Sequence, residues 1–301
     1  MLISEKGGQR VIEIHFDKAS EAEKLFWLLN ERKRDACPLF HAAYDGNKIV
    51  AVYIYGDEKH VLETYIIPAM TAFVQSVLED RLLLSIISGV FYFRDREEQQ
   101  QILELVHSFL DGERRDYQKG AEFAASRMAL LREACASFLR DGLSFSFSSF
   151  VTFRLKPYIE RLEHYVGLAI DEYKLEQEYQ TFVQMLRECL VGRTPQWPRL
   201  YLVHDPPHFV FYDRHRRELS AAEVKRLIDR HLVVSQPMYI DSSVLAPLVS
   251  LAPAEIELYT DHPDDGMVQT LQNVFQERLR LRRRADFSRL FVASAGNGEE
   301  S

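Results

Sequence analysis

The sequence predicts an α+β protein, with an α/β part at each end and a helical part between them. Three observations predict this class. Short apolar segments bounded by turn residues, which are typical of strands, occur before residue 80 and after residue 193. Between them the apolar residues recur at steps of three and four, the period of a helix. The loop Gly192–Pro198, with two prolines and a glycine, predicts a boundary before the second α/β part.

The N-terminal α/β part, residues 1–80, is expected to resemble most of a ferredoxin-like unit. Its elements are predicted in the order strand, helix, strand, strand, helix, at Val11–Phe16, Asp17–Glu31, Leu39–Tyr44, Lys48–Tyr55 and Glu58–Leu78. Gly46 favours a hairpin between the second and third strands, because glycine adopts a positive φ without strain. Such a unit serves many functions and predicts none of them.

The central part, residues 81–192, is predicted to be entirely helical and to include one long helix. Leu82–Phe93 is expected to be a buried helix, because it is shorter than the ~20 apolar residues that a membrane span needs. After two further helices and an aromatic, serine-rich segment, the long helix runs from Tyr158 to Val191. Its apolar stripe changes face near Glu176, which predicts that its two halves pack against different neighbours.

The C-terminal α/β part, residues 193–284, alternates strand and helix signals, and residues 285–301 are expected to be a mobile tail. Its strands are predicted at Leu200–His204, His208–Tyr212, Met238–Ile240, Glu255–Tyr259 and Arg278–Arg282. Its helices are predicted to begin at Ser220, Ser242 and Asp264.

Composition indicates a protein of the cytoplasm. The net charge of -8 favours solubility and argues against general nucleic-acid binding. Three cysteines, Cys37, Cys135 and Cys189, lie far apart without metal-ligand spacing, which suits a reducing compartment. The N-terminal residues hold no apolar signal region, and no membrane span is predicted.

Six segments of the chain carry a specific resemblance. They are Phe145–Lys156, Ala169–Tyr179, Glu97–Leu103, Pro237–Ser243, Pro247–Pro253 and Asp264–Leu271. Together they closely resemble the YtxC-like family of sporulation proteins. The resemblance extends from about Leu82 to Arg280, whereas residues 1–80 match only in pattern. It implies a soluble protein of endospore-forming bacteria that is expressed in connection with sporulation. It implies no activity, so no catalytic residue is carried over.

Four aspartates form the main candidate site. Asp241, Asp261, Asp264 and Asp265 follow predicted strands of the C-terminal part, where open α/β sheets bind ligands. Carboxylates gathered there can hold Mg²⁺, as in a phosphoryl-transfer or nuclease-like site. The competing interpretation, which the sequence favours, is that Asp241, Asp264 and Asp265 start helices and accept backbone N–H bonds.

Other polar clusters have simpler interpretations. Arg280, Arg282 and Arg284, with Arg278 and Arg283, form a basic stripe that could contact nucleic acid, but a short stripe on an acidic protein is more often an exposed strand with ion pairs. The three histidines around the predicted hairpin, His204, His208 and His215, could ligate a metal but are expected to be turn and edge residues.

The sequence therefore favours a cytoplasmic protein that acts by binding protein partners, without catalysis and without a cofactor. A metal-dependent phosphoryl-transfer or hydrolytic enzyme that uses the C-terminal aspartates stays open as an alternative. Nucleic-acid binding through the arginine stripe is a second alternative.

Overall fold

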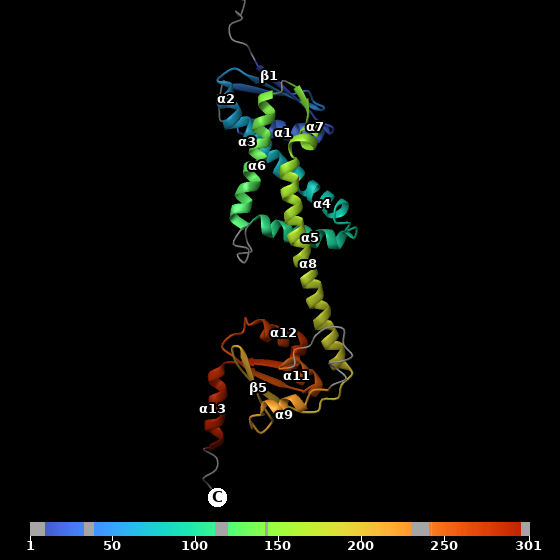
Figure 1. Cartoon of the computed structure of the whole chain (residues 1–301). Helices are drawn as coiled ribbons and strands as arrows, with labels where there is room; N and C mark the ends of the chain where they lie inside the picture. The colour runs from blue at the N-terminus through green and yellow to red at the C-terminus, as the bar shows by residue number, and fades with distance from the viewer. Residues whose placement is uncertain are drawn as a thin grey trace, which may run out of the picture. The chain divides into compact units, whose positions relative to one another are not determined.

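The computed structural model describes residues 10–32, 39–111, 120–141, 144–229, 241 and 243–295 (Figure 1). The chain divides into two compact units, Met1–Lys174 and Leu175–Ser301, called unit 1 and unit 2 below. Each unit combines a four-stranded sheet with helices, which confirms the predicted α+β class. The predicted boundaries after residues 80 and 192 lie inside these units.

Unit 1 begins with the expected order of strand, helix, strand, strand and helix. Its elements are β1 Arg10–His15, α1 Ala19–Glu31, β2 Phe40–Tyr44, β3 Ile49–Ile54, a continuous helix Glu58–Gly89 that contains α2 to α4, α5 Arg96–Leu110, α6 Gly120–Asp141, β4 Ser144–Ser146, α7 Phe147–Arg154 and the first part of α8 Lys156–Val191.

The sheet of unit 1 has the order β2-β3-β1-β4. The pairs β2–β3 and β1–β3 are antiparallel, whereas β4 pairs parallel with β1 through Glu13 and Ser144. β4 corrects the expectation of an entirely helical central part. Its formation depends on a partner strand about 130 residues earlier, which no local pattern reveals. Directly after β4, Phe147 stacks on Phe16 with ring centroids 4.9 Å apart and anchors the aromatic segment in the core.

The helix Glu58–Gly89 is the central core helix of unit 1. It contains two π-helical segments, Leu62–Ile66 and Val74–Leu78. Pro68, just after the first, has no N–H to continue the usual hydrogen-bond ladder, which favours such a local widening. Its length and composition also fit a membrane span, but 56% of its most apolar window is buried inside the unit, as in any core helix.

A buried ion pair joins three helices of unit 1. Glu79, at the start of α4 (Glu79–Gly89), accepts a hydrogen bond from Arg127 of α6 at 2.8 Å and one from the hydroxyl of Tyr158 of α8. Both charged side chains are buried. Burial, together with the neighbouring Glu79 carboxylate, raises the pKa of Tyr158 well above its usual value, so this hydroxyl keeps its proton.

Unit 2 holds a second sheet, in the order β6-β5-β7-β8. Its elements are the end of α8, β5 Leu200–Asp205, β6 His208–Tyr212, α9 Ala221–Arg226, α11 Leu245–Leu251, β7 Ile256–Tyr259, α12 Gly266–Phe275, β8 Leu279–Arg282 and α13 Arg284–Ala295. β5, β7 and β8 run parallel, and β6 pairs antiparallel with β5. The predicted strand Met238–Ile240 and the predicted helix start at Ser242 lie outside the described residues.

The cores explain the two-faced stripe of α8. Leu162, Val166 and Tyr173 belong to the core of unit 1, whereas Val183 and Leu186 belong to the core of unit 2. The change of face near Glu176 therefore separates two sets of neighbours, as the sequence predicts.

The segment after β8 differs from the expected mobile tail. Residues 284–295 form α13, and the ring of Phe287 packs 5.0 Å from that of Tyr259 and 4.8 Å from that of Tyr212. The sequence interpretation missed this helix because the contacts of Phe287 are with strands distant in sequence, which a local pattern does not reveal. Residues 296–301 lie outside the described part.

The two cores can be tested separately on one helix. We expect Leu162→Ala and Leu186→Ala each to lower the free energy of unfolding by about 2–5 kcal/mol, because both side chains are fully buried. Leu175→Ala is the matched control, since 62% of Leu175 is exposed, and should change stability by less than about 0.5 kcal/mol. Hydrogen exchange should show reduced protection in unit 1 for Leu162→Ala and in unit 2 for Leu186→Ala. An equally large cost for Leu175→Ala would contradict this assignment.

Candidate functional site

The predicted site lies where the parallel strands of unit 2 end. The carboxyl ends of β5, β7 and β8 meet at one edge of the sheet, because parallel strands share their direction. His204 and Asp205 end β5, Thr260 and Asp261 follow β7, and Arg284 follows β8. Open α/β sheets bind ligands at such an edge.

Two of the aspartates at this edge, Asp261 and Asp265, accept backbone hydrogen bonds. Asp265 caps α12 and accepts N–H bonds from Met267 at 2.9 Å and Val268 at 3.3 Å. Asp261 accepts the N–H of Arg284 at 3.3 Å, and Asp264 is exposed.

Asp241 holds the turn that precedes α11. Its carboxylate accepts the N–H groups of Ser243 at 3.0 Å and Val244 at 2.8 Å, and also the hydroxyl of Ser243. In the part of the chain that the structure describes, no three His, Cys, Asp or Glu side chains are grouped so that they could hold a metal ion. The metal-site hypothesis stays a prediction. Of its candidate ligands, Asp265 caps a helix, Asp241 and Asp261 accept backbone N–H bonds, and Asp264 is exposed.

His204 is the most buried polar group of this edge. Its Nδ1 lies 3.0 Å from the hydroxyl of Thr260, and its ring stacks on Phe209 with centroids 4.2 Å apart. Nε2 lies 4.0 Å from the Asp265 carboxylate. Burial lowers the pKa of His204, and the nearby carboxylate of Asp265 partly opposes this effect.

The position of His204 corrects its interpretation as a turn or edge residue. β5 lies between β6 and β7, so a side chain near its end is covered on both sides. His208 and His215 fit the interpretation, since both are at the surface of the hairpin or of the turn after it.

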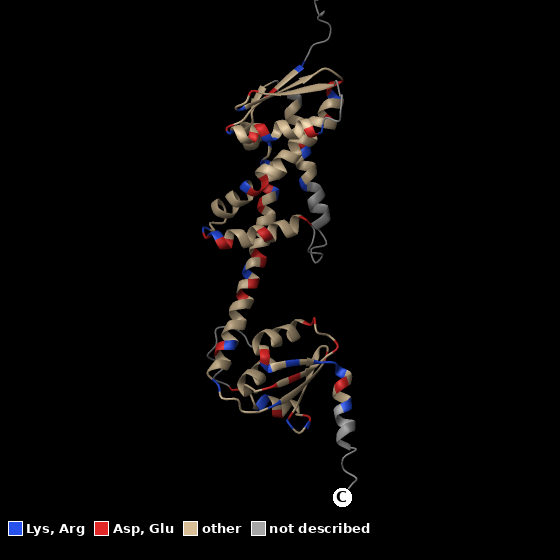
Figure 2. Ribbon diagram, turned by 180° about the vertical axis from the view of Figure 1, so that it is seen from behind, with Lys and Arg blue, Asp and Glu red and all other residues tan. Residues whose placement is uncertain are grey.

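Two arginines of the basic stripe, Arg280 and Arg284, form ion pairs. Arg280 pairs with Glu255 at 3.2 Å, and Arg284 makes two contacts with the Asp205 carboxylate, at 2.7 and 2.9 Å. Arg280 and Arg282 align in the sheet with Glu257 and Tyr259. Figure 2 shows basic and acidic residues together on the strands of unit 2. Nucleic-acid binding through this stripe stays an untested prediction.

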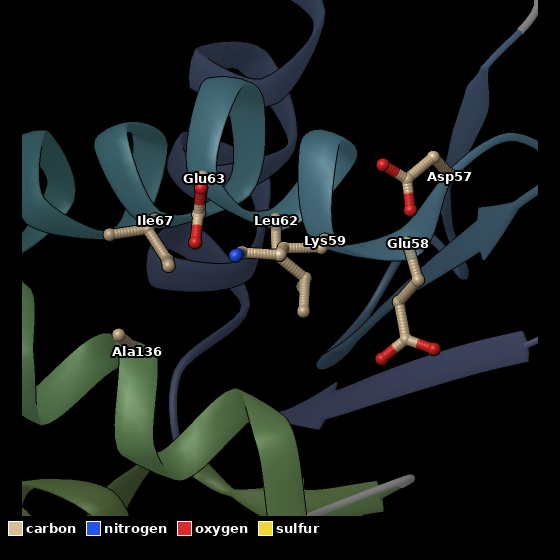
Figure 3. Close-up of a pocket in the computed structure, with 7 residues that line it drawn as sticks. All are labelled: Asp57, Glu58, Lys59, Leu62, Glu63, Ile67 and Ala136. Atoms are coloured by element: carbon tan, nitrogen blue, oxygen red, sulfur yellow. The ribbon is translucent and has the colours of Figure 1, made fainter.

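A surface groove of unit 1 is the second candidate site, and the sequence interpretation did not find it. It has a volume of about 520 Å³ and lies between the start of the helix Glu58–Gly89 and α6 (Figure 3). Its lining residues are Asp57, Glu58, Lys59, Leu62, Glu63, Ile67 and Ala136. All except Ala136 come from two to three turns of one helix and its N-cap.

The groove has an apolar floor and a charged rim. Leu62 and Ile67 are each 5% exposed, and Ala136 lies opposite them on α6. Arg10 fixes one end, because its guanidinium pairs with Glu58 and donates to the backbone carbonyl of Leu139 at 2.9 Å. The groove was missed because Ala136 lies about 70 residues after Ile67, the last of the other lining residues.

His204 makes the stability of unit 2 depend on pH. Because its pKa is lowered in the folded state, the unfolded chain binds the proton more readily, and stability should fall as pH drops below about 6.5. Urea unfolding at several pH values should show this loss, and His204→Gln should weaken it. His215→Gln, at an exposed position, is the control. An unchanged pH profile in His204→Gln would assign the effect to other groups.

The metal hypothesis has a direct test at Asp261. Its carboxylate is exposed and accepts a long hydrogen bond from the Arg284 N–H, so Asp261→Asn should change stability by less than about 0.5 kcal/mol. We expect Mg²⁺ and Mn²⁺ to leave the melting temperature of the wild-type chain unchanged. A metal-dependent rise that disappears in Asp261→Asn would favour the enzyme alternative, because a cation stabilises the state that binds it.

Comparison with known proteins identifies the family. The model of the YtxC-like family matches residues 64–280. A relative, the "Uncharacterized protein YtxC" of Bacillus subtilis (strain 168), is 40% identical over 220 residues, which cover 73% of this chain and 77% of the relative. No solved structure shows a significant match to this chain. The chain therefore belongs to the YtxC-like family.

Proposed function

We propose that this chain is a cytoplasmic, non-catalytic binding protein that acts in connection with sporulation, and that the groove of unit 1 receives part of a protein partner. The link to sporulation rests on the family resemblance. The cytoplasmic assignment is supported by the number and spacing of the cysteines.

The observation that carries the binding function is the groove itself. Its volume lies within the range of ligand-binding clefts, and its floor is apolar with charged groups at the rim, as in sites that hold a partner side chain. Its lining combines carboxylates, one ammonium group and three apolar side chains. These groups can bind and orient a segment through charge and through apolar contact.

Exposed aromatic side chains on unit 1 add support. Trp27 is 61% exposed, Tyr92 72% and Phe153 75%. Aromatic residues are enriched in protein interfaces, because they bury a large apolar area with little loss of side-chain entropy. A partner that contacts unit 1 can therefore use more surface than the groove alone.

The proposed function can be tested by blocking the groove. We expect an affinity-tagged chain, produced in sporulating Bacillus subtilis in place of its YtxC relative, to retain a specific protein partner. Ala136→Trp should lose that partner, because the indole fills the space between α6 and the helix Glu58–Gly89. Gln101→Trp, at an exposed position of α5, introduces the same side chain elsewhere and should retain it.

Melting temperatures of both variants control for folding, and Ala136→Leu is a milder block if the indole destabilises unit 1. Recovery of the same partner by the wild-type chain, Ala136→Trp and Gln101→Trp would show that the groove is not the binding surface. Equal recovery of that partner from growing and from sporulating cells would contradict the link to sporulation.

A further inference from the structure

We propose that the groove of unit 1 accepts a basic side chain, arginine or lysine, from an extended segment of the partner protein. This inference rests on the proposed function, since it names the chemistry of the segment that the groove receives. Three features of the groove support it: the charge of its rim, the apolar character of its floor and its length.

The rim is acidic. Three carboxylates, Asp57, Glu58 and Glu63, stand against one ammonium group, that of Lys59 (Figure 3). Glu58 is already paired with Arg10. Asp57 occupies the N-cap position of α2 (Glu58–Val61), but its side chain makes no capping hydrogen bond. Its carboxylate is therefore available to a cation from outside, unlike those of Asp241 and Asp265 in unit 2, which hold backbone N–H groups.

The floor suits the aliphatic stem of a long basic side chain. Leu62 and Ile67 lie along the floor, and Ala136 closes the opposite side. Arginine and lysine pack three or four methylene groups on apolar surface while their charged ends stay near water and carboxylates. A neutral apolar side chain would fill the floor but make no ionic contact with the Asp57 and Glu63 carboxylates. An acidic side chain would be repelled by the rim.

The length of the groove favours a peptide segment over a small free cation. From Asp57 to Ile67 the helix advances about 15 Å, at ~1.5 Å per residue. An extended chain covers the same length with four or five residues, at ~3.3 Å each. The floor and the carboxylates of Asp57 and Glu63 thus match one basic residue together with its neighbours in an extended segment.

A selection with a random peptide display library tests this inference without prior choice of sequence. Peptides that bind the full-length chain are expected to be enriched in arginine or lysine next to apolar residues. Their binding should be lost with Ala136→Trp. The double variant Asp57→Lys/Glu63→Lys should bind the selected peptides about tenfold more weakly, since two favourable charge contacts become repulsive.

Glu104→Lys is the control for charge, because it makes the same kind of change at an exposed position of α5 outside the groove. It should leave the affinity unchanged. Binding to the wild-type chain should weaken as salt increases, because exposed charge contacts are screened. Melting temperatures again report whether each variant is folded, and Asp57→Asn/Glu63→Gln is a milder pair with a smaller expected loss.

The outcomes separate this inference from the proposed function. If Ala136→Trp loses the cellular partner but the double lysine variant keeps it, the groove binds a partner that is not basic, and this inference is wrong. Enrichment of neutral or acidic peptides, no enrichment at all, or equal binding of basic peptides to Ala136→Trp would also overturn it. Spermidine that binds as tightly as the selected peptides, and competes with them, would assign the groove to a small cation instead.

Discussion

Helix α8 is the constraint on which the rest of the structure depends, because it supplies side chains to both hydrophobic cores. Leu162 and Val166 complete the core of unit 1, and Leu186 completes that of unit 2. Between them, residues 174–178 are all exposed, so this part of the helix is held by its own backbone hydrogen bonds rather than by packing. Each unit therefore stabilises one end of α8 by packing against it. The loss of either core would remove the packing at that end.

The two candidate sites use their carboxylates in different ways. In unit 2, Asp265 holds the start of α12, and Asp205 holds Arg284 at the start of α13. A ligand that recruited either group would first have to replace these contacts, which has a cost in stability. In unit 1, the side chain of Asp57 lines the groove and makes no capping hydrogen bond. The aspartates of unit 2, which the sequence pattern highlights, thus make more structural contacts than Asp57. The groove of unit 1 forms only when two distant segments pack together.

The sequence could predict what depends on neighbouring residues. The long helix and its change of face follow from the local period of apolar residues, and the capping role of Asp265 follows from its place before an amphipathic helix. The strand β4 could not be predicted, since three residues form a strand only when β1 pairs with them. α13 depends on Phe287 reaching Tyr259, and the groove depends on Ala136 lying opposite Leu62. These features are tertiary, so single-sequence patterns do not contain them.

The surroundings of Cys135 and Cys189 limit the reactivity of these two thiols. Burial in the core of unit 1 raises the pKa of the Cys135 thiol to about 12, and burial also raises the pKa of Cys189 in unit 2. Oxidants and disulfides react with the thiolate, which Cys135 hardly forms at neutral pH and which Cys189 forms less readily than an exposed cysteine. Both described cysteines act as small apolar residues. Oxidative stress should therefore spare Cys135, and the core of unit 1 should survive changes in the thiol balance of the cell.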